Sequence, residues 1–256
     1  MVRLRRRGCR PTTPRCQLLL VVGIAACVGA LVQSSVGFGL GVVAAPVITV
    51  ADPSLMPASL LVVSTVLPLL TLVREWRHID FPGLGWALLG RLPGTICGVW
   101  LIAAFPGRGM EAVVAMTVLV AVGISLLPVD VPRTRLTLSV AGGVAAVTAT
   151  TAAIGGPPMA LIYQRAGGAK LRATLSAFFV VGAAGSLSML QLANHLERRS
   201  VIGGLLMLPF VAVGFALAAP LRRRLDSGRI RPAVLAIAAC AATALLVKAL
   251  LVKAAT

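Results

Sequence analysis

Charged residues are scarce in this sequence, and acidic residues are the scarcest of all. Asp and Glu number only 7 among 256 residues, and charged residues together make up 12%, about half the share in soluble domains. Apolar residues make up 58%. A soluble domain needs a far more polar surface than this supplies, so the composition excludes that class and predicts an integral membrane protein.

Several familiar active-site patterns are also missing. All seven acids lie in or beside predicted loops, and the chain contains neither H-E-x-x-H nor the phosphate-binding loop G-x-x-x-x-G-K-[ST]. No Ser/His pair is placed for acyl transfer. The five cysteines form no C-x-x-C pair, and three of them lie inside apolar runs. We therefore expect no metal site, no cofactor and no enzymatic activity.

Basic residues, by contrast, are plentiful, and they lie between the apolar runs. The 24 Lys and Arg give a net charge of +17, but they do not form the aromatic-rich basic domain that binds nucleic acid. We interpret them as topology signals and as contacts with the anionic headgroups of a lipid bilayer. The arginine-rich tail at 1–16 resembles a signal peptide, but the apolar run after it continues far past the cleavage-like sequence Ile24 to Cys27. We expect a retained first helix and a cytoplasmic tail.

Eight apolar runs have nearly the length that crosses a membrane, which takes about 20 residues. They cover 17–37 with an extension to 51, 54–73, 84–105, 109–127, 136–155, 172–192, 201–221 and 232–252. The predicted fold is all-α, with about eight transmembrane helices in a bacterial plasma membrane. The distribution of Lys and Arg favours cytoplasmic termini. A re-entrant hairpin or an extra crossing at the first run would change the parity of one half.

The first apolar run contains a polar, glycine-rich interruption. No charged residue occurs from Gln17 to Ala51, which is too long for one perpendicular crossing. In its middle, Gly37, Gly39 and Gly41 occupy every second position, a pattern that disfavours a regular helix. Irregular backbone at membrane depth is tolerated only inside protein or beside a watery cavity. The pattern predicts a broken membrane helix that forms half of a substrate site.

A similar interruption occurs in the second half of the chain. A shift of 118 residues (155 − 37) places Gly37 on Gly155, within a segment that runs from Thr148 to Pro158. We therefore predict two homologous halves of about four helices each, at 17–127 and 136–252, joined by a linker at 128–135. A broken helix opens each half. Corresponding Gly/Pro-interrupted segments in two halves indicate the binding site of a transporter.

The two interruptions have the chemistry of an anion site. A helix that begins inside the membrane presents unpaired backbone N–H groups and the positive end of its dipole, which together bind oxyanions. The predicted substrate-binding residues are Gln33, Ser34, Ser35, Gly37, Gly39, Gly41, Arg91, Thr150, Thr151, Gly155 and Gly156. The alternative for the glycines is close helix packing. For the hydroxyl residues it is hydrogen bonding to their own helix.

Arg91 is the one clearly intramembrane charge in the sequence. It lies about seven residues into the run 84–105, so attraction of the anion and snorkelling of the side chain to the membrane surface both remain open. Gly90, Gly94 and Gly98 recur at every fourth residue around it. This spacing predicts a small-residue ridge for close helix packing.

These motifs resemble those of the TauE/SafE sulfite-exporter family. The likeness rests on Val36 to Gly41 with Ala45-Pro46, and on Ile154 to Pro158, and it covers about 17–252. The second motif departs from the family pattern, because Pro157-Pro158 stand where a further glycine is common. The resemblance implies a multi-pass permease for small anions, typically sulfite or sulfonates. We predict a secondary transporter that works by alternating access, with an intramembrane enzyme, a channel or a structural membrane protein as alternatives.

Overall fold

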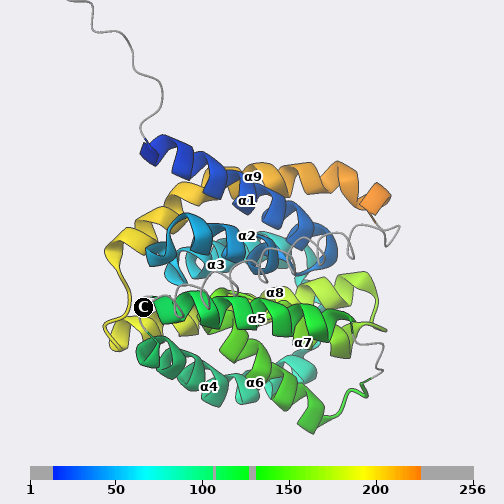
Figure 1. Cartoon of the computed structure of the whole chain (residues 1–256). Coiled ribbons are helices and arrows are strands. Elements are labelled where there is room, and N and C mark those ends of the chain that lie inside the picture. The colour runs from blue at the N-terminus through cyan, green and yellow to red at the C-terminus, as the bar shows by residue number, and fades with distance from the viewer. Residues whose placement is uncertain (1–13, 106–107, 127–130, 226–256) are drawn as a thin grey trace, which may run out of the picture.

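The computed structural model describes residues 14–105, 108–126 and 131–225 (Figure 1). In these ranges the regular secondary structure is all helical and contains no strand, as the sequence predicts. The helices are α1 (Pro14–Val36), α2 (Leu40–Ala51), η1 (Pro53–Leu55), α3 (Ala58–Glu75), η2 (Trp76–His78), α4 (Phe81–Ala104), α5 (Arg108–Leu126), α6 (Arg135–Ala152), α7 (Gly156–Tyr163), α8 (Gly168–Leu192) and α9 (Arg198–Leu225).

Among the described residues, four helical segments are long and apolar enough to cross a membrane. They are Ala58–His78, Phe81–Ala104, Gly168–Leu192 and Arg198–Ala218. On α4 the large side chains Leu92, Ile96 and Trp100 recur at every fourth residue and are exposed. Side chains with this spacing lie on one face of a helix, and a bilayer accepts such an apolar outer face without cost. The helices therefore fit an integral membrane protein.

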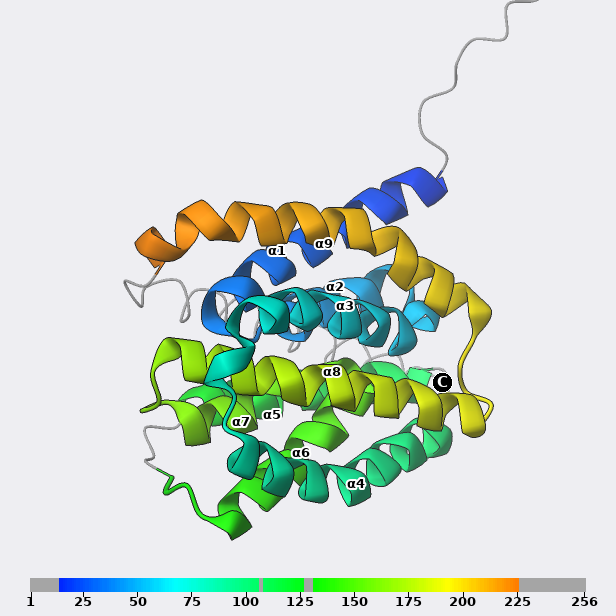
Figure 2. The same ribbon diagram turned by 180° about the vertical axis from the view of Figure 1, so that it is seen from behind.

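The bundle is arranged in layers that Figures 1 and 2 show from opposite sides. α1 packs along α9 at one edge, α4 packs along α6 at the opposite edge, and α3 packs against α8 between them. Glycine permits the closest of these contacts. A Cβ built at Gly90 would overlap the backbone of Ser139, and one built at Gly94 would overlap that of Gly143. The predicted small-residue ridge on α4 is confirmed as the surface that packs against α6.

Two helical hairpins enter this bundle from opposite ends. Leu19, near the start of α1, and Asp52, at the end of α2, line the same pocket, so this hairpin returns to the end where it began. Arg133, just before α6, and Tyr163, the last residue of α7, both donate hydrogen bonds to Asp80. Asp52 and Asp80 lie beyond opposite ends of α3. The α1–α2 and α6–α7 hairpins therefore point toward each other.

The start of α4 differs from the predicted run. The helix begins at Phe81 rather than at residue 84, because Pro82 fits in the first turn, where its missing N–H costs no helical hydrogen bond. Arg91 consequently lies near the middle of the 24-residue helix and not close to its end. The run 232–252, predicted as the last crossing, lies outside the described residues.

Candidate functional site

The first interruption is a sharp turn between α1 and α2. Gly37 has φ 99° and Gly39 has φ 137°, a conformation that residues with a Cβ rarely adopt. The Gly37 N–H donates to the carbonyl of Gln33 (2.7 Å), and the Leu40 N–H donates to the Gln33 side-chain oxygen (3.2 Å). Gln33 thus closes the turn from α1 and caps the first N–H group of α2. The Gln33 side chain was predicted to bind substrate, and its amide oxygen accepts a backbone hydrogen bond from Leu40.

The second interruption ends α6 with a left-handed residue. Ala153 has φ 57°, and its N–H donates to Ala149 while the Ile154 N–H donates to Thr148. This pattern terminates helices by satisfying their last carbonyl groups. Helix α7 then begins at Gly156 with Pro157 and Pro158, which have no N–H. The start of α7 therefore offers fewer unpaired donors than the start of α2.

The two turns are in direct contact with each other. A Cβ built at Gly41 would overlap the carbonyl of Ala153, and one built at Gly156 would overlap Phe38. Phe38 and Gly156 are also 118 residues apart (156 − 38), the offset that relates the two interruptions.

A small cavity lies between the turns and is lined by both of them. Its walls are formed by Gln33, Phe38, Gly39, Gly41, Val42, Ala153, Ile154, Gly155, Gly156, Pro157 and Phe179. The cavity has a volume of about 20 Å³, which is room for about one water molecule. The structure thus brings together five of the predicted residues, namely Gln33, Gly39, Gly41, Gly155 and Gly156. Phe38 and Phe179 were not predicted, because an aromatic residue in an apolar run gives no sign that it borders a cavity.

The predicted serines of α1 do not line this cavity. The Ser34 hydroxyl donates to the Ala30 carbonyl (2.6 Å), and the Ser35 hydroxyl donates to the Leu31 carbonyl (2.9 Å). Both carbonyls lie one helical turn earlier in α1. These are the bonds expected of hydroxyl residues that bind their own helix.

The predicted threonines of α6 lie outside the cavity as well. Thr151 donates to the Val147 carbonyl (2.9 Å) and lies 3.3 Å from the Thr117 hydroxyl of α5. The Thr150 hydroxyl is 2.9 Å from the Ser186 hydroxyl of α8. Thr150 therefore links the end of α6 to α8. It lies on the side of α6 that packs against α4 and α8.

Arg91 is directed into the protein. Only 5% of its surface is exposed, and its guanidinium carbon lies 4.5 Å from the centre of the Phe178 ring. A Cβ built at Gly182 of α8 would overlap the guanidinium group. The side chain therefore lies flat against α8 and does not snorkel to the membrane surface. It is not among the residues that line the cavity.

An ion pair joins α3 to α8 at one end of the bundle, where α3 ends and α8 begins. Arg172 of α8 binds Glu75 of α3 through two nitrogens, at 2.8 and 3.1 Å. The Arg172 side chain also packs against Gly37, so this pair lies beside the first turn. The sequence does not reveal the pair, because Glu75 and Arg172 are far apart along the chain.

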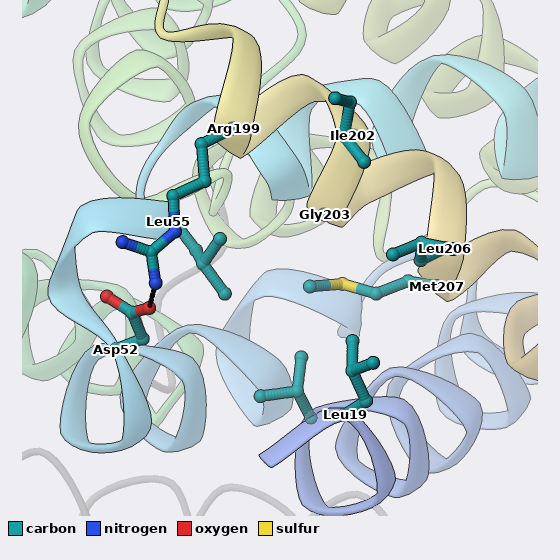
Figure 3. A pocket seen from close by; sticks show the side chains of 9 residues that line it. Leu19, Asp52, Leu55, Arg199, Ile202, Gly203, Leu206 and Met207 are labelled. Atoms are coloured by element: carbon teal, nitrogen blue, oxygen red, sulfur yellow. Dashed lines mark hydrogen bonds and ion pairs between the residues drawn. The ribbon is translucent and has the colours of Figure 1, made fainter. Parts of the chain in front are cut away.

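A larger pocket lies at the opposite end of the bundle (Figure 3). It has a volume of about 480 Å³ and is lined by Leu19, Val22, Asp52, Leu55, Arg199, Ile202, Gly203, Leu206 and Met207. Asp52 and Arg199 bind each other at 2.7 Å, and the remaining walls are apolar. Such walls suit hydrocarbon better than a small anion.

Comparison with known proteins gives one match. The family model described as Sulfite exporter TauE/SafE matches residues 21–245. No curated protein matches the chain. No solved structure matches it either.

Proposed function

Because the chain belongs to the TauE/SafE family, a family of membrane transporters, we propose that it is a secondary transporter of small sulfur oxyanions. Sulfite and organosulfonates are the substrates that this membership favours. The proposed location is the bacterial cell membrane, with cytoplasmic termini.

One observation carries the proposal. The two glycine-rich turns, far apart in the sequence, line one cavity. Transporters built from repeats bind substrate where two broken helices meet near the middle of the membrane. The aligned turns, and not any single serine or threonine, define the proposed site.

The start of α2 provides the chemistry for binding an anion. Apart from the Leu40 N–H, which Gln33 holds, the first-turn N–H groups of α2 have no partner within the helix, and they lie at the positive end of its dipole. Gly39 and Gly41 let Val32 and Ala153 pack closely against the backbone there. The start of α7 contributes less, because Pro157 and Pro158 lack N–H groups. We infer that the oxyanion binds mainly to the first turn.

The arrangement of the helices supports two inverted halves. When α1–α2 is exchanged with α6–α7, α3 with α8, and α4 with α9, the packing pattern is preserved: α1 with α9 becomes α6 with α4, and α3 packs against α8 in both. The two hairpins then enter the membrane from opposite sides and return without crossing it. Two of the eight predicted runs are re-entrant under this proposal.

The size of the cavity supports alternating access. A sulfite ion has four heavy atoms and does not fit in about 20 Å³, so the site must enlarge to take up substrate. Rocking of one inverted half against the other would open it first to one side and then to the other. With both hairpins re-entrant, Lys and Arg divide almost evenly between the two faces. The prediction of cytoplasmic termini then rests on the basic tail alone.

Flux in proteoliposomes tests the proposal. The purified chain is expected to take up [³⁵S]sulfite with saturation and to show counterflow, which a channel would not. Gly41→Ala should lower uptake at least tenfold, because the added Cβ overlaps Ala153 and separates the turns. Gly123→Ala is the matched control, because a Cβ at this site in α5 meets nothing within 4 Å. Uptake by Gly41→Ala equal to that of the control would remove the turns from the mechanism.

A further inference from the structure

The structure separates the predicted site residues into two groups. One group lines the cavity between the turns, whereas Arg91 and Thr150 lie elsewhere, where α4, α6 and α8 meet. We call Arg91, Thr150 and Ser186 the Arg91 cluster. Each of the three residues comes from a different helix, and all three are buried.

Arg91 carries a charge that the described protein does not neutralise. Its Nη1 atom is buried and has no hydrogen-bond partner among the described residues. Three described acids at the helix ends are engaged elsewhere: Asp52 with Arg199, Glu75 with Arg172, and Asp80 with Arg133. A buried guanidinium without a carboxylate partner is costly unless an anion binds it.

The surroundings of Arg91 form a cradle for such an anion. Gly182 leaves room for the guanidinium against α8, and Phe178 covers one face of it. Ser186 lies one turn beyond Gly182 on the same side of α8, and its hydroxyl meets that of Thr150 at 2.9 Å. The guanidinium is a donor that suits an oxyanion head group, and the Thr150–Ser186 hydroxyl pair lies further along α4, where Thr150 meets Gly98.

Two neighbouring aromatic rings, Phe178 and Phe179, lie between Arg91 and the cavity. Phe178 faces Arg91 and Phe179 lines the cavity, and their ring centres are 6.1 Å apart in an edge-to-face arrangement. An anion that leaves the cavity past these rings would reach Arg91 next.

We propose that the Arg91 cluster is a second binding position for the substrate's oxyanion head, visited after the cavity during transport. This inference rests on the proposed function. It assigns initial binding to the first turn and passage through the membrane to Arg91, so loss of Arg91 impairs movement of the anion more than its binding.

Two measurements on each variant of the full chain test the assignment. Equilibrium binding of [³⁵S]sulfite to detergent-purified protein reports the cavity, and uptake into proteoliposomes reports the complete path. Arg91→Met and Gly182→Ala are expected to keep binding within about threefold and to lose uptake at least tenfold. Gly182→Ala keeps the positive charge of Arg91 but displaces its guanidinium group. Arg91→Lys also keeps a positive charge, so it should restore part of the uptake that Arg91→Met loses. The matched control is Gly185→Ala on α8, where a Cβ meets nothing within 4 Å.

A chemical readout separates a charge effect from a structural one. In a cysteine-free background, Ser186→Cys should react faster with the anionic 2-sulfonatoethyl methanethiosulfonate than with its trimethylammonium analogue. Adding Arg91→Met should remove that preference.

Four results would overturn the proposal or its premise. Normal uptake by Arg91→Met and Gly182→Ala, or equal reaction of both reagents with Arg91 present, would exclude a second position. Joint loss of binding and uptake would place Arg91 in the first position. Absence of both binding and uptake in the unmodified chain would instead refute the proposed transport function.

Discussion

At the scale of single residues, Gln33 shows how one side chain serves both the fold and the proposed site. It belongs to α1, yet its amide oxygen accepts the hydrogen bond from the first N–H of α2 and so holds the turn at Gly37 and Gly39. It also lines the cavity. Substitutions at Gln33 should therefore separate stability from anion binding.

Gln33→Leu is expected to lower the free energy of unfolding by about 1–3 kcal/mol, because it leaves the buried Leu40 N–H without a partner. Gln33→Glu keeps an acceptor oxygen for that N–H but places a negative charge beside the proposed anion. Its thermal unfolding should stay close to that of the unmodified protein, while the KM for sulfite rises at least tenfold. An unchanged KM in Gln33→Glu would place the anion away from the first turn.

At the scale of elements, the two hairpins are alike in position and unequal in chemistry. Both turns line the cavity, but only α2 begins with residues that can donate backbone hydrogen bonds throughout its first turn. Pro157 lines the cavity at a position where an N–H would point along the α7 axis toward it. Because the second turn has fewer N–H donors, a substitution that adds a donor there should strengthen anion binding.

Pro157→Ala should lower the KM for sulfite several-fold, because it supplies an N–H donor to an anion, and such charge-assisted bonds are about twice as strong as neutral ones. Pro158→Ala is the control, since Pro158 does not line the cavity. Initial rates of uptake at a series of sulfite concentrations measure the effect. A higher KM in Pro157→Ala than in the control would contradict binding near the second turn.

At the scale of the whole molecule, the opposed hairpins determine which loops lie on which face of the membrane in the proposed topology. The α6–α7 hairpin begins and ends beside Asp80, which accepts hydrogen bonds from Arg133 and Tyr163. Helix α8 then runs to the opposite end of the bundle, where α9 begins (Figures 1 and 2). The flanks of the hairpin should therefore lie on one membrane face, and the α8–α9 connection should lie on the other.

Labelling of single cysteines with an impermeant maleimide checks this threading. In a cysteine-free background, Pro132→Cys before α6 and Gly167→Cys after α7 should react from the same side of the membrane. His195→Cys, between α8 and α9, should react from the opposite side. All three positions are exposed. Labelling of positions 132 and 167 from opposite sides would show that the segment crosses the membrane.

The sequence by itself determined the class of the protein and the places where its helices are interrupted. Composition decides whether a chain enters a bilayer, and glycines at every second position disfavour a helix wherever they occur, so both properties are local and could be predicted. The glycine motifs also identified the family, which the match over residues 21–245 shows.

Only the tertiary structure decided which of those residues meet. Gly41 contacts Ala153, Arg172 binds Glu75, and Arg91 turns inward against Gly182, because helices distant in the chain present these groups to one another. The sequence does not show which face of a helix its neighbour covers. For the same reason it left the direction of Arg91 and the bonds of Thr150 open. The return of each hairpin depends on contacts between helix ends, such as those at Asp80, that no local pattern records.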